Sequence, residues 1–151
     1  VQKAVELGAL EVIPVLTERC VSRPNQKAME KKLERFNRIA YEAAKQCGRG
    51  VVPLVRPMLP FRLAIAEMAG WDLPIMLYEE EPLPLREVLA AKPHPKWVGL
   101  FVGSEGGLAL EEAVWAQSQG IHTAGLGERI LRCETAPVAA LAVLMYHLGE
   151  F

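Results

Sequence analysis

Two loop segments in the second half of the chain carry the residue types best suited to holding a ligand. Residues 102–107 read Val-Gly-Ser-Glu-Gly-Gly, and residues 126–136 read Leu-Gly-Glu-Arg-Ile-Leu-Arg-Cys-Glu-Thr-Ala. Each segment follows an apolar run that is typical of a buried strand. Glycine has no Cβ and adopts positive φ readily, so the main chain of such loops can approach a planar group closely. The two segments therefore predict a ligand held largely by backbone.

The glycine-rich segment does not match the common motifs for phosphate binding or nucleophilic catalysis. No Gly-Lys-Ser/Thr follows it, which excludes a P-loop, and it comes after the fourth predicted strand. Dinucleotide sites place their glycines after the first strand instead. Ser104 stands between Gly103 and Glu105, so it is not the serine of a G-x-S-x-G nucleophile elbow.

The chain shows no convincing pattern of metal ligands. Cys20, Cys47 and Cys133 are widely spaced without a C-x-x-C pair, and the three histidines are scattered. Glutamates occupy positions 79–81, but adjacent residues in a loop rarely converge on one ion, and at least two of them are better explained as solvated charge. We expect no metal, and we expect the thiols to stay reduced in the cytoplasm.

Alternating strands and helices must position the two loops. We predict strands over residues 12–16, 51–55, 74–78, 97–102 and 121–126, and helices over residues 26–46, 85–91, 109–118 and 136–148, with a short helix ending at Met68. The apolar run 97–102 shows no alternation, which fits a parallel strand covered on both faces. Ligands of open α/β sheets bind beyond the carboxyl ends of the strands. The pattern predicts one α/β domain over residues 1–151 with a mostly parallel sheet flanked by helices.

The net charge of −1 conceals an uneven distribution. Residues 1–62 hold 12 Lys and Arg against 6 Asp and Glu, whereas residues 63–151 hold 5 against 12. A basic half favours a polyanionic partner. Arg19, Arg23 and Arg49 fall in predicted loops near strand ends, where contact with RNA phosphate is plausible, whereas Lys31, Lys32 and Arg35 are explained as well by a solvated helix face.

The last predicted helix, residues 136–148, is apolar nearly all round. Such a helix must be covered on more than one side, either within this domain or by a second subunit, and we favour a homodimer. No run of eighteen apolar residues occurs, so we expect no membrane partner. The chain begins at Val1 without a cleavable leader, and we interpret it as a fragment of a longer protein.

Four segments together resemble one known family. V-G-S-E-G-G at 102–107, L-G-E-R-I-L-R-C-E-T-A at 126–136, K-A-V-E-L-G at 3–8 and E-A-A-K-Q-C-G-R at 42–49 are similar to segments of the bacterial small-subunit ribosomal RNA uridine-N3 methyltransferases (RsmE type). These enzymes belong to the SPOUT class of methyltransferases. The resemblance covers the whole chain in order. Ser104 stands where the family usually has proline, and serine restores a backbone N–H there.

The resemblance implies a SPOUT-type α/β fold with a deep C-terminal trefoil knot, and an S-adenosyl-L-methionine site made by three loops. The cofactor-binding residues that it implies are Leu77, Tyr78, Glu79, Val102, Gly103, Glu105, Gly106, Gly107, Leu126, Gly127, Ile130 and Leu131. It also implies that ribosomal RNA or the small ribosomal subunit is the partner. The family's N-terminal PUA-like RNA-binding domain is absent from these 151 residues.

Methylation at uracil N3 requires loss of a weakly acidic proton, so the site needs a base or a cation that stabilises the uracil anion. Arg132, just past the ligand loop, is the candidate for stabilising that charge, and Glu134 could orient it or favour the start of the last helix. No general base is evident. Two alternatives remain at this point: a SPOUT methyltransferase that acts on another RNA, such as a tRNA ribose or base, and an RNA-binding scaffold without catalysis.

Overall fold

Short parallel sheets organise the chain in the computed structural model, which describes residues 1–151. The central sheet has β5 (Leu73–Leu77) between β6 (Val98–Phe101) and β7 (His122–Ala124). Two small sheets pair β1 (Glu11–Val12) with β3 (Leu54–Val55), and β2 (Val15–Leu16) with β4 (Leu59–Pro60). Every one of these pairs is parallel. The predicted α/β class with parallel strands is confirmed.

The first predicted strand, residues 12–16, is divided between β1 and β2. Pro14 lies between them and has no N–H to donate to a neighbouring strand, although its carbonyl still accepts a 2.9 Å hydrogen bond from the backbone N–H of Leu59. The strand predicted over 51–55 is likewise shorter than expected and contains only Leu54–Val55. Both differences shorten strands without changing their order.

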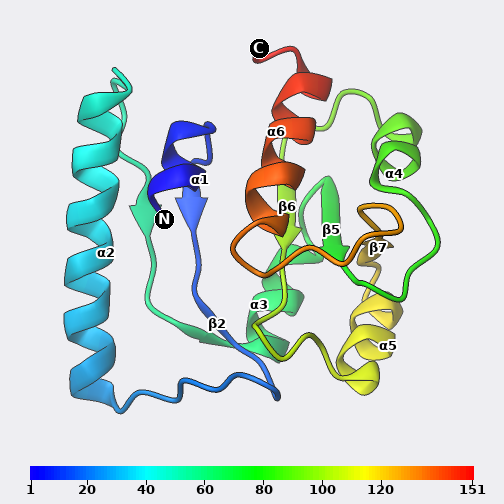
Figure 1. The fold of residues 1–151 in the computed structure, drawn as a ribbon, viewed down its shortest axis with the longest axis horizontal. Coiled ribbons are helices and arrows are strands. Elements are labelled where there is room, and N and C mark those ends of the chain that lie inside the picture. Colours follow the sequence, from blue (N-terminus) through cyan, green and yellow to red (C-terminus); the bar gives the residue numbers. More distant parts are fainter.

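Six helices surround the strands: α1 (Gln2–Glu6), α2 (Gln26–Gln46), α3 (Phe61–Met68), α4 (Leu85–Ala91), α5 (Leu110–Ser118) and α6 (Ala136–Leu148). The bounds of α2, α4 and α6 are those expected from the sequence. Asn25 caps α2, because its side chain accepts a 3.0 Å hydrogen bond from the backbone N–H of Ala28. In Figure 1, α1 and α2 lie on one side of the molecule, and α4 and α5 lie on the other beyond the central sheet.

Strand β5 forms the centre of the core, and all five of its residues are buried. Successive side chains of a strand point to opposite faces. Met76 therefore packs with residues of α3 and α5, whereas Ile75 and Leu77 pack with residues of α4 and α6. Helices thus cover both faces of the central sheet. A separate core joins α1, α2 and β3 through Val5, Ala40, Ala43, Ala44 and Val55.

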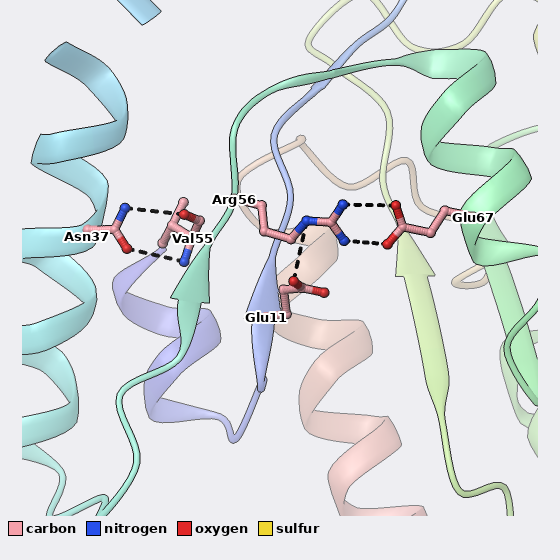
Figure 2. Close-up of polar contacts among 5 residues, drawn as sticks. All are labelled: Glu11, Asn37, Val55, Arg56 and Glu67. Carbon is pink, nitrogen blue, oxygen red and sulfur yellow. Dashed lines mark hydrogen bonds and ion pairs between the residues drawn. The ribbon is translucent and has the colours of Figure 1, made fainter. Parts of the chain in front are cut away.

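Polar contacts connect the basic half of the chain to α3 (Figure 2). The Arg56 guanidinium binds the Glu67 carboxylate through two nitrogens, and its Nε lies 3.5 Å from Glu11 on β1.

Asn37 of α2 pairs with the backbone of Val55 in both directions: its amide donates to the carbonyl at 3.2 Å and its oxygen accepts from the N–H at 3.3 Å. The side chain of Asn37 thereby takes the place of a neighbouring strand beside β3.

Helix α6 packs against both α1 and α4. Its buried residues are Ala136, Ala140 and Leu144, while Val143 and Tyr146 are 46% and 75% exposed. The apolar circumference seen in the sequence is therefore only partly covered within this chain. No helix is both long and apolar enough to cross a lipid bilayer.

Candidate active site

One cavity of about 310 Å³ lies at the carboxyl ends of the three central strands. Leu77, Tyr78 and Glu79 line it at the end of β5, residues 102–105 and 107 line it after β6, and residues 126–133 line it after β7. This is the edge at which open parallel sheets bind ligands, and the volume suits a small molecule. The structure brings the two motif-bearing loops together with a third loop, as the sequence predicted. Of the twelve predicted cofactor-binding residues, all except Gly106 line this cavity.

The glycine loop after β6 is a tight turn. The N–H of Gly107 donates a 2.9 Å hydrogen bond to the carbonyl of Ser104, and Gly107 has a φ of +71°. A Cβ at Gly107 would lie only 2.6 Å from a carboxylate oxygen of Glu79, which lines the same cavity. The positive φ favours glycine at this position, and a side chain here would also displace the Glu79 carboxylate.

Gly106 faces the N-terminal half of the chain. A Cβ built on it would lie 2.8 Å from the carbonyl oxygen of Arg19. Gly106 is not among the residues that line the cavity. Its small size permits close packing of the glycine loop against the segment that carries Arg19, a contact between loops that sequence spacing did not indicate.

The three glutamates after β5 have different surroundings. Glu79 lines the cavity, Glu80 accepts a 2.9 Å hydrogen bond from the Tyr78 hydroxyl, and Glu81 accepts a 2.5 Å hydrogen bond from Thr123. Burial, followed by the bond to Glu80, raises the pKa of Tyr78, so this hydroxyl stays protonated and acts as a donor. Sequence reasoning assigned solvated charge to at least two of these glutamates and missed the fixed role of Glu81.

Arg132 lines the cavity, and no carboxylate lies within ion-pair distance of its guanidinium. Glu134 does not line the cavity. Its own backbone N–H and then the Cys133 thiol, which donates at 3.4 Å, lower the pKa of its carboxyl. Burial raises the pKa of that thiol. Glu134 thus lies beside the site as an ionised group whose bonded partner is Cys133, and it makes no hydrogen bond to Arg132.

The three arginines expected to contact phosphate have unequal surroundings. Arg19 is exposed, and its positive charge acts on Tyr78 in the cavity by opposing the rise in the pKa of that residue. Arg23 donates to the backbone carbonyls of Thr17 and Glu18 at 3.3 and 2.6 Å. Arg49 is half-buried and donates to two carbonyls near α1, those of Val5 and Ala9, at 2.8 and 2.7 Å.

No group of three or more His, Cys, Asp or Glu side chains is placed to hold a metal ion. Residues of both charges line the cavity: the acidic residues are Glu79, Glu105 and Glu128, and the basic residues are Arg129 and Arg132. Such a cavity, with apolar walls and both signs of charge, suits a zwitterionic or cationic small molecule with an apolar ring.

Comparison with known proteins shows the family to which this fold and three-loop site belong. The family model for the RNA methyltransferase domain matches residues 1–145. Because the match covers nearly the entire chain, the protein belongs to the RNA methyltransferase domain family.

Curated relatives and solved structures agree with this assignment. The chain is 36% identical over 151 residues to ribosomal RNA small subunit methyltransferase E of Bacillus subtilis, covering 97% of this chain and 59% of that protein. It is 37% identical to the Synechocystis protein of the same name, covering 94% of this chain and 46% of that one. The chain thus spans about half to three fifths of the length of these relatives.

Two similar structures contain a bound cofactor. A methyltransferase of Legionella pneumophila in complex with SAM superimposes with a TM-score of 0.89 at 33% identity, covering 96% of this chain and 58% of that chain. Ribosomal RNA small subunit methyltransferase E of Neisseria gonorrhoeae, bound to S-adenosyl methionine, superimposes with a TM-score of 0.84 at 36% identity. The match covers 95% of this chain and 58% of that chain. The arrangement of strands and loops seen here is therefore shared with proteins that bind this cofactor.

Proposed function

We propose that this chain is the catalytic domain of an S-adenosylmethionine-dependent methyltransferase that acts on N3 of a uridine in small-subunit ribosomal RNA. The observation that carries the proposal is the single cavity in which both motif-bearing loops meet the end of β5. The names of the curated relatives and the cofactor of the two similar structures support it.

The residues of the cavity fit this cofactor. Leu77, Leu126 and Leu131 offer apolar surface for an adenine ring, and the glycine loop offers backbone groups. The Glu79 and Glu105 carboxylates place negative charge in a site that would receive a sulfonium and an ammonium group. When bound, S-adenosylmethionine supplies an electrophilic methyl group on positively charged sulfur.

The contribution of the protein is positioning and charge stabilisation. Loops fixed by hydrogen bonds hold the reacting groups in line, which converts an encounter in solution into a reaction within one complex. We assign to Arg132 the stabilisation of negative charge on a uracil oxygen as N3 loses its proton, because Arg132 lines the cavity and its guanidinium has no ion-pair partner. Glu134 stays ionised beside it, and the positive charge of Arg132 contributes to the lowered pKa of the Glu134 carboxyl.

RNA reaches the cavity from the basic half of the chain in this proposal. Arg19 is the strongest candidate for a phosphate contact, since it is exposed and close to the glycine loop. Arg23 retains some exposed surface beside it, whereas Arg49 has its guanidinium directed at backbone carbonyls and contributes chiefly to the fold. The relatives' substrate and the three free cysteines support action in the cytoplasm.

We also infer a homodimer through the outer face of α6 and a trefoil knot in the C-terminal segment. Val143 and Tyr146 leave apolar surface uncovered on α6, which supports the dimer. The bridge between Pro84 and Gly125 holds the loop after β7 against the loop after β5, which is consistent with the knot implied by the family. Sedimentation of a monomer at micromolar concentration would contradict the dimer, and an experimental chain trace without a threaded segment would contradict the knot.

The experiment that tests the function is methyl transfer to unmodified small-subunit ribosomal RNA by the protein at its natural length. Labelled methyl groups should enter the RNA, and mass spectrometry of the nucleosides should place them on uridine N3. Methylation of a ribose, of another base, or of tRNA alone would redirect the assignment to another substrate. No transfer to any RNA by protein that binds the cofactor would support the scaffold alternative.

A further inference from the structure

Three polar side chains are buried in this molecule, those of Thr17, Glu112 and Thr123. Glu112 is the only charged one, and it lies on α5 with 9% of its surface exposed. Its carboxylate has no ion-pair partner. A buried charge is costly unless strong hydrogen bonds compensate it. The hydrogen-bond donors to Glu112 therefore compensate the cost of burying its charge, and they show which segments this residue joins.

The two oxygens of Glu112 bind two backbone segments that are far apart in sequence. Oε2 accepts a 3.1 Å hydrogen bond from the N–H of Ala109, at the start of the same helix. Oε1 accepts a 2.9 Å hydrogen bond from the N–H of Glu18, which lies 94 positions away in the basic half. Hydrogen bonds to an ionised acceptor are stronger than those between neutral groups. Glu112 therefore fixes the segment of residues 17–19 to the start of α5.

The same segment contacts the glycine loop of the cavity at two further points. The Thr17 hydroxyl lies 3.3 Å from the Ser104 hydroxyl, within hydrogen-bond distance. Gly106 packs so closely on Arg19 that a Cβ would lie 2.8 Å from the Arg19 carbonyl oxygen. Residues 17–19 and the glycine loop thus form one packed unit that contains both cavity-lining residues and the exposed Arg19.

We propose that Glu112 is a positioning residue that couples RNA binding at Arg19 to cofactor binding at the glycine loop. This inference rests on the proposed function. RNA that engages Arg19 acts on residues 17–19, and the contacts of Thr17, Glu112 and Gly106 transmit that constraint to the loop that lines the cavity. Coupling of this kind is reciprocal, so bound cofactor strengthens RNA binding by the same factor.

Glu112→Gln is the informative variant. The substitution keeps the size of the side chain but leaves one oxygen for two backbone donors and places an amide N–H₂ against one of them. Glu111→Gln is the matched control, because it removes the same charge from the same turn of α5 at an exposed position without a side-chain hydrogen bond. Both variants change the helix dipole interaction in the same way, so their difference reports the two hydrogen bonds that Glu112 accepts, from residues 18 and 109.

The test measures the affinity of the protein at its natural length for S-adenosylhomocysteine, with and without a saturating transcript of small-subunit ribosomal RNA. In the wild type and in Glu111→Gln, RNA should strengthen binding by a factor of about five or more. In Glu112→Gln this factor should fall to about one. A purely structural role would lower both affinities and leave their ratio unchanged, so the ratio separates positioning from general destabilisation.

The possible outcomes separate the two proposals. Wild-type protein that fails to bind S-adenosylhomocysteine would overturn the proposed function. Wild-type protein that binds it with no effect of RNA, or a Glu112→Gln variant with the coupling of Glu111→Gln, would overturn the positioning role. If Glu112→Gln does not fold, Arg19→Ala takes its place, because an exposed side chain can be removed without loss of the fold. It should reduce the coupling in the same way, and unchanged coupling in that variant would again overturn the inference.

Discussion

The hydroxyl of Thr123 donates a 2.5 Å hydrogen bond to Oε2 of Glu81, and this contact joins the end of β7 to the loop that follows β5. Gln117 of α5 donates to the same hydroxyl at 2.8 Å. Nearby, a Cβ on Gly125 would lie 2.5 Å from the Glu81 carbonyl oxygen, so the two loops also pack tightly through backbone. A half-buried polar contact therefore joins the two segments whose neighbouring residues, Glu79 and Ala124, line the cavity.

We predict that Thr123→Val weakens cofactor binding without touching the cavity. The substitution keeps the shape of the side chain but removes the shortest hydrogen bond to the Glu81 carboxylate, and a hydrogen bond to a charged group contributes about 1.5–3 kcal/mol. Part of that cost should appear as an approximately tenfold weaker affinity for S-adenosylhomocysteine in calorimetry. His122→Val changes the exposed neighbour on the same strand and serves as the control. Equal affinities for the two variants would show that the Thr123 contact does not position the loop.

Gly106→Val should weaken both cofactor and RNA binding by pushing the glycine loop away from Arg19. The new Cβ would meet a backbone oxygen at 2.8 Å, and the branched side chain cannot turn away from it. We expect at least about a tenfold loss of affinity for S-adenosylhomocysteine, by analogy with other overpacked sites. Gly50→Val is the control, because nothing lies within 4 Å of a Cβ there. Wild-type affinity in Gly106→Val would mean that the close packing of these loops has no bearing on the site.

Arg132→Ala should depress methyl transfer while sparing cofactor affinity. Its proposed role begins only when charge develops on uracil, so the substitution should lower kcat by a factor of about 10²–10³. Single-turnover kinetics with saturating cofactor would measure it. Arg129→Ala, which removes another cavity-lining guanidinium, should have a clearly smaller effect on kcat. A parallel loss of cofactor binding in Arg132→Ala would instead make this residue part of the cofactor loop.

Acid should destabilise the protein partly through Glu67 and Asp72. Hydrogen bonds from Arg56 lower the pKa of Glu67 in the folded state, and the backbone N–H groups of Lys96 and Trp97 lower that of Asp72. A carboxyl group whose pKa is lower in the folded than in the unfolded protein stabilises the fold at pH values above its unfolded pKa of about 4. This stabilisation is lost as the pH falls through the pKa of the folded state. Urea unfolding between neutral pH and about pH 3 should therefore show a smaller loss of stability in Glu67→Gln than in the wild type.

A control for the pH experiment is Glu34→Gln, which removes an exposed carboxylate of α2 that forms no side-chain hydrogen bond or ion pair. Its stability should fall with acid as steeply as that of the wild type. If Glu67→Gln and Glu34→Gln have the same pH dependence, the contact between Arg56 and Glu67 makes no measurable contribution.

Features that depend on neighbouring residues were predictable from the sequence. The apolar spacing of residues 26–46 predicted the bounds of α2, whereas the cap formed by Asn25 was seen only in the structure. The strand predicted over residues 12–16 is interrupted at Pro14, which has no N–H for strand pairing. The two motif-bearing loops pointed to the same edge of the sheet because carboxyl ends of parallel strands meet there.

Contacts between distant segments were not predictable in this way. Nothing near Glu112 indicates a partner 94 positions earlier, and the run of glutamates at 79–81 looks like solvated charge until Thr123 is seen beside Glu81. Arg49 looked like a phosphate contact because of its charge and loop position, but two backbone carbonyls accept its hydrogen bonds. Side-chain type suggests which bonds a residue can form, whereas the fold determines which partner is within reach.

A calorimetric titration of this chain with S-adenosylmethionine, with and without a metal chelator, tests the proposed cofactor site. The cavity at the ends of β5, β6 and β7 predicts one saturable site per chain, with the same affinity in both conditions. Absence of saturable binding, or binding that disappears when the chelator is added, would contradict a metal-independent S-adenosylmethionine site at these loops.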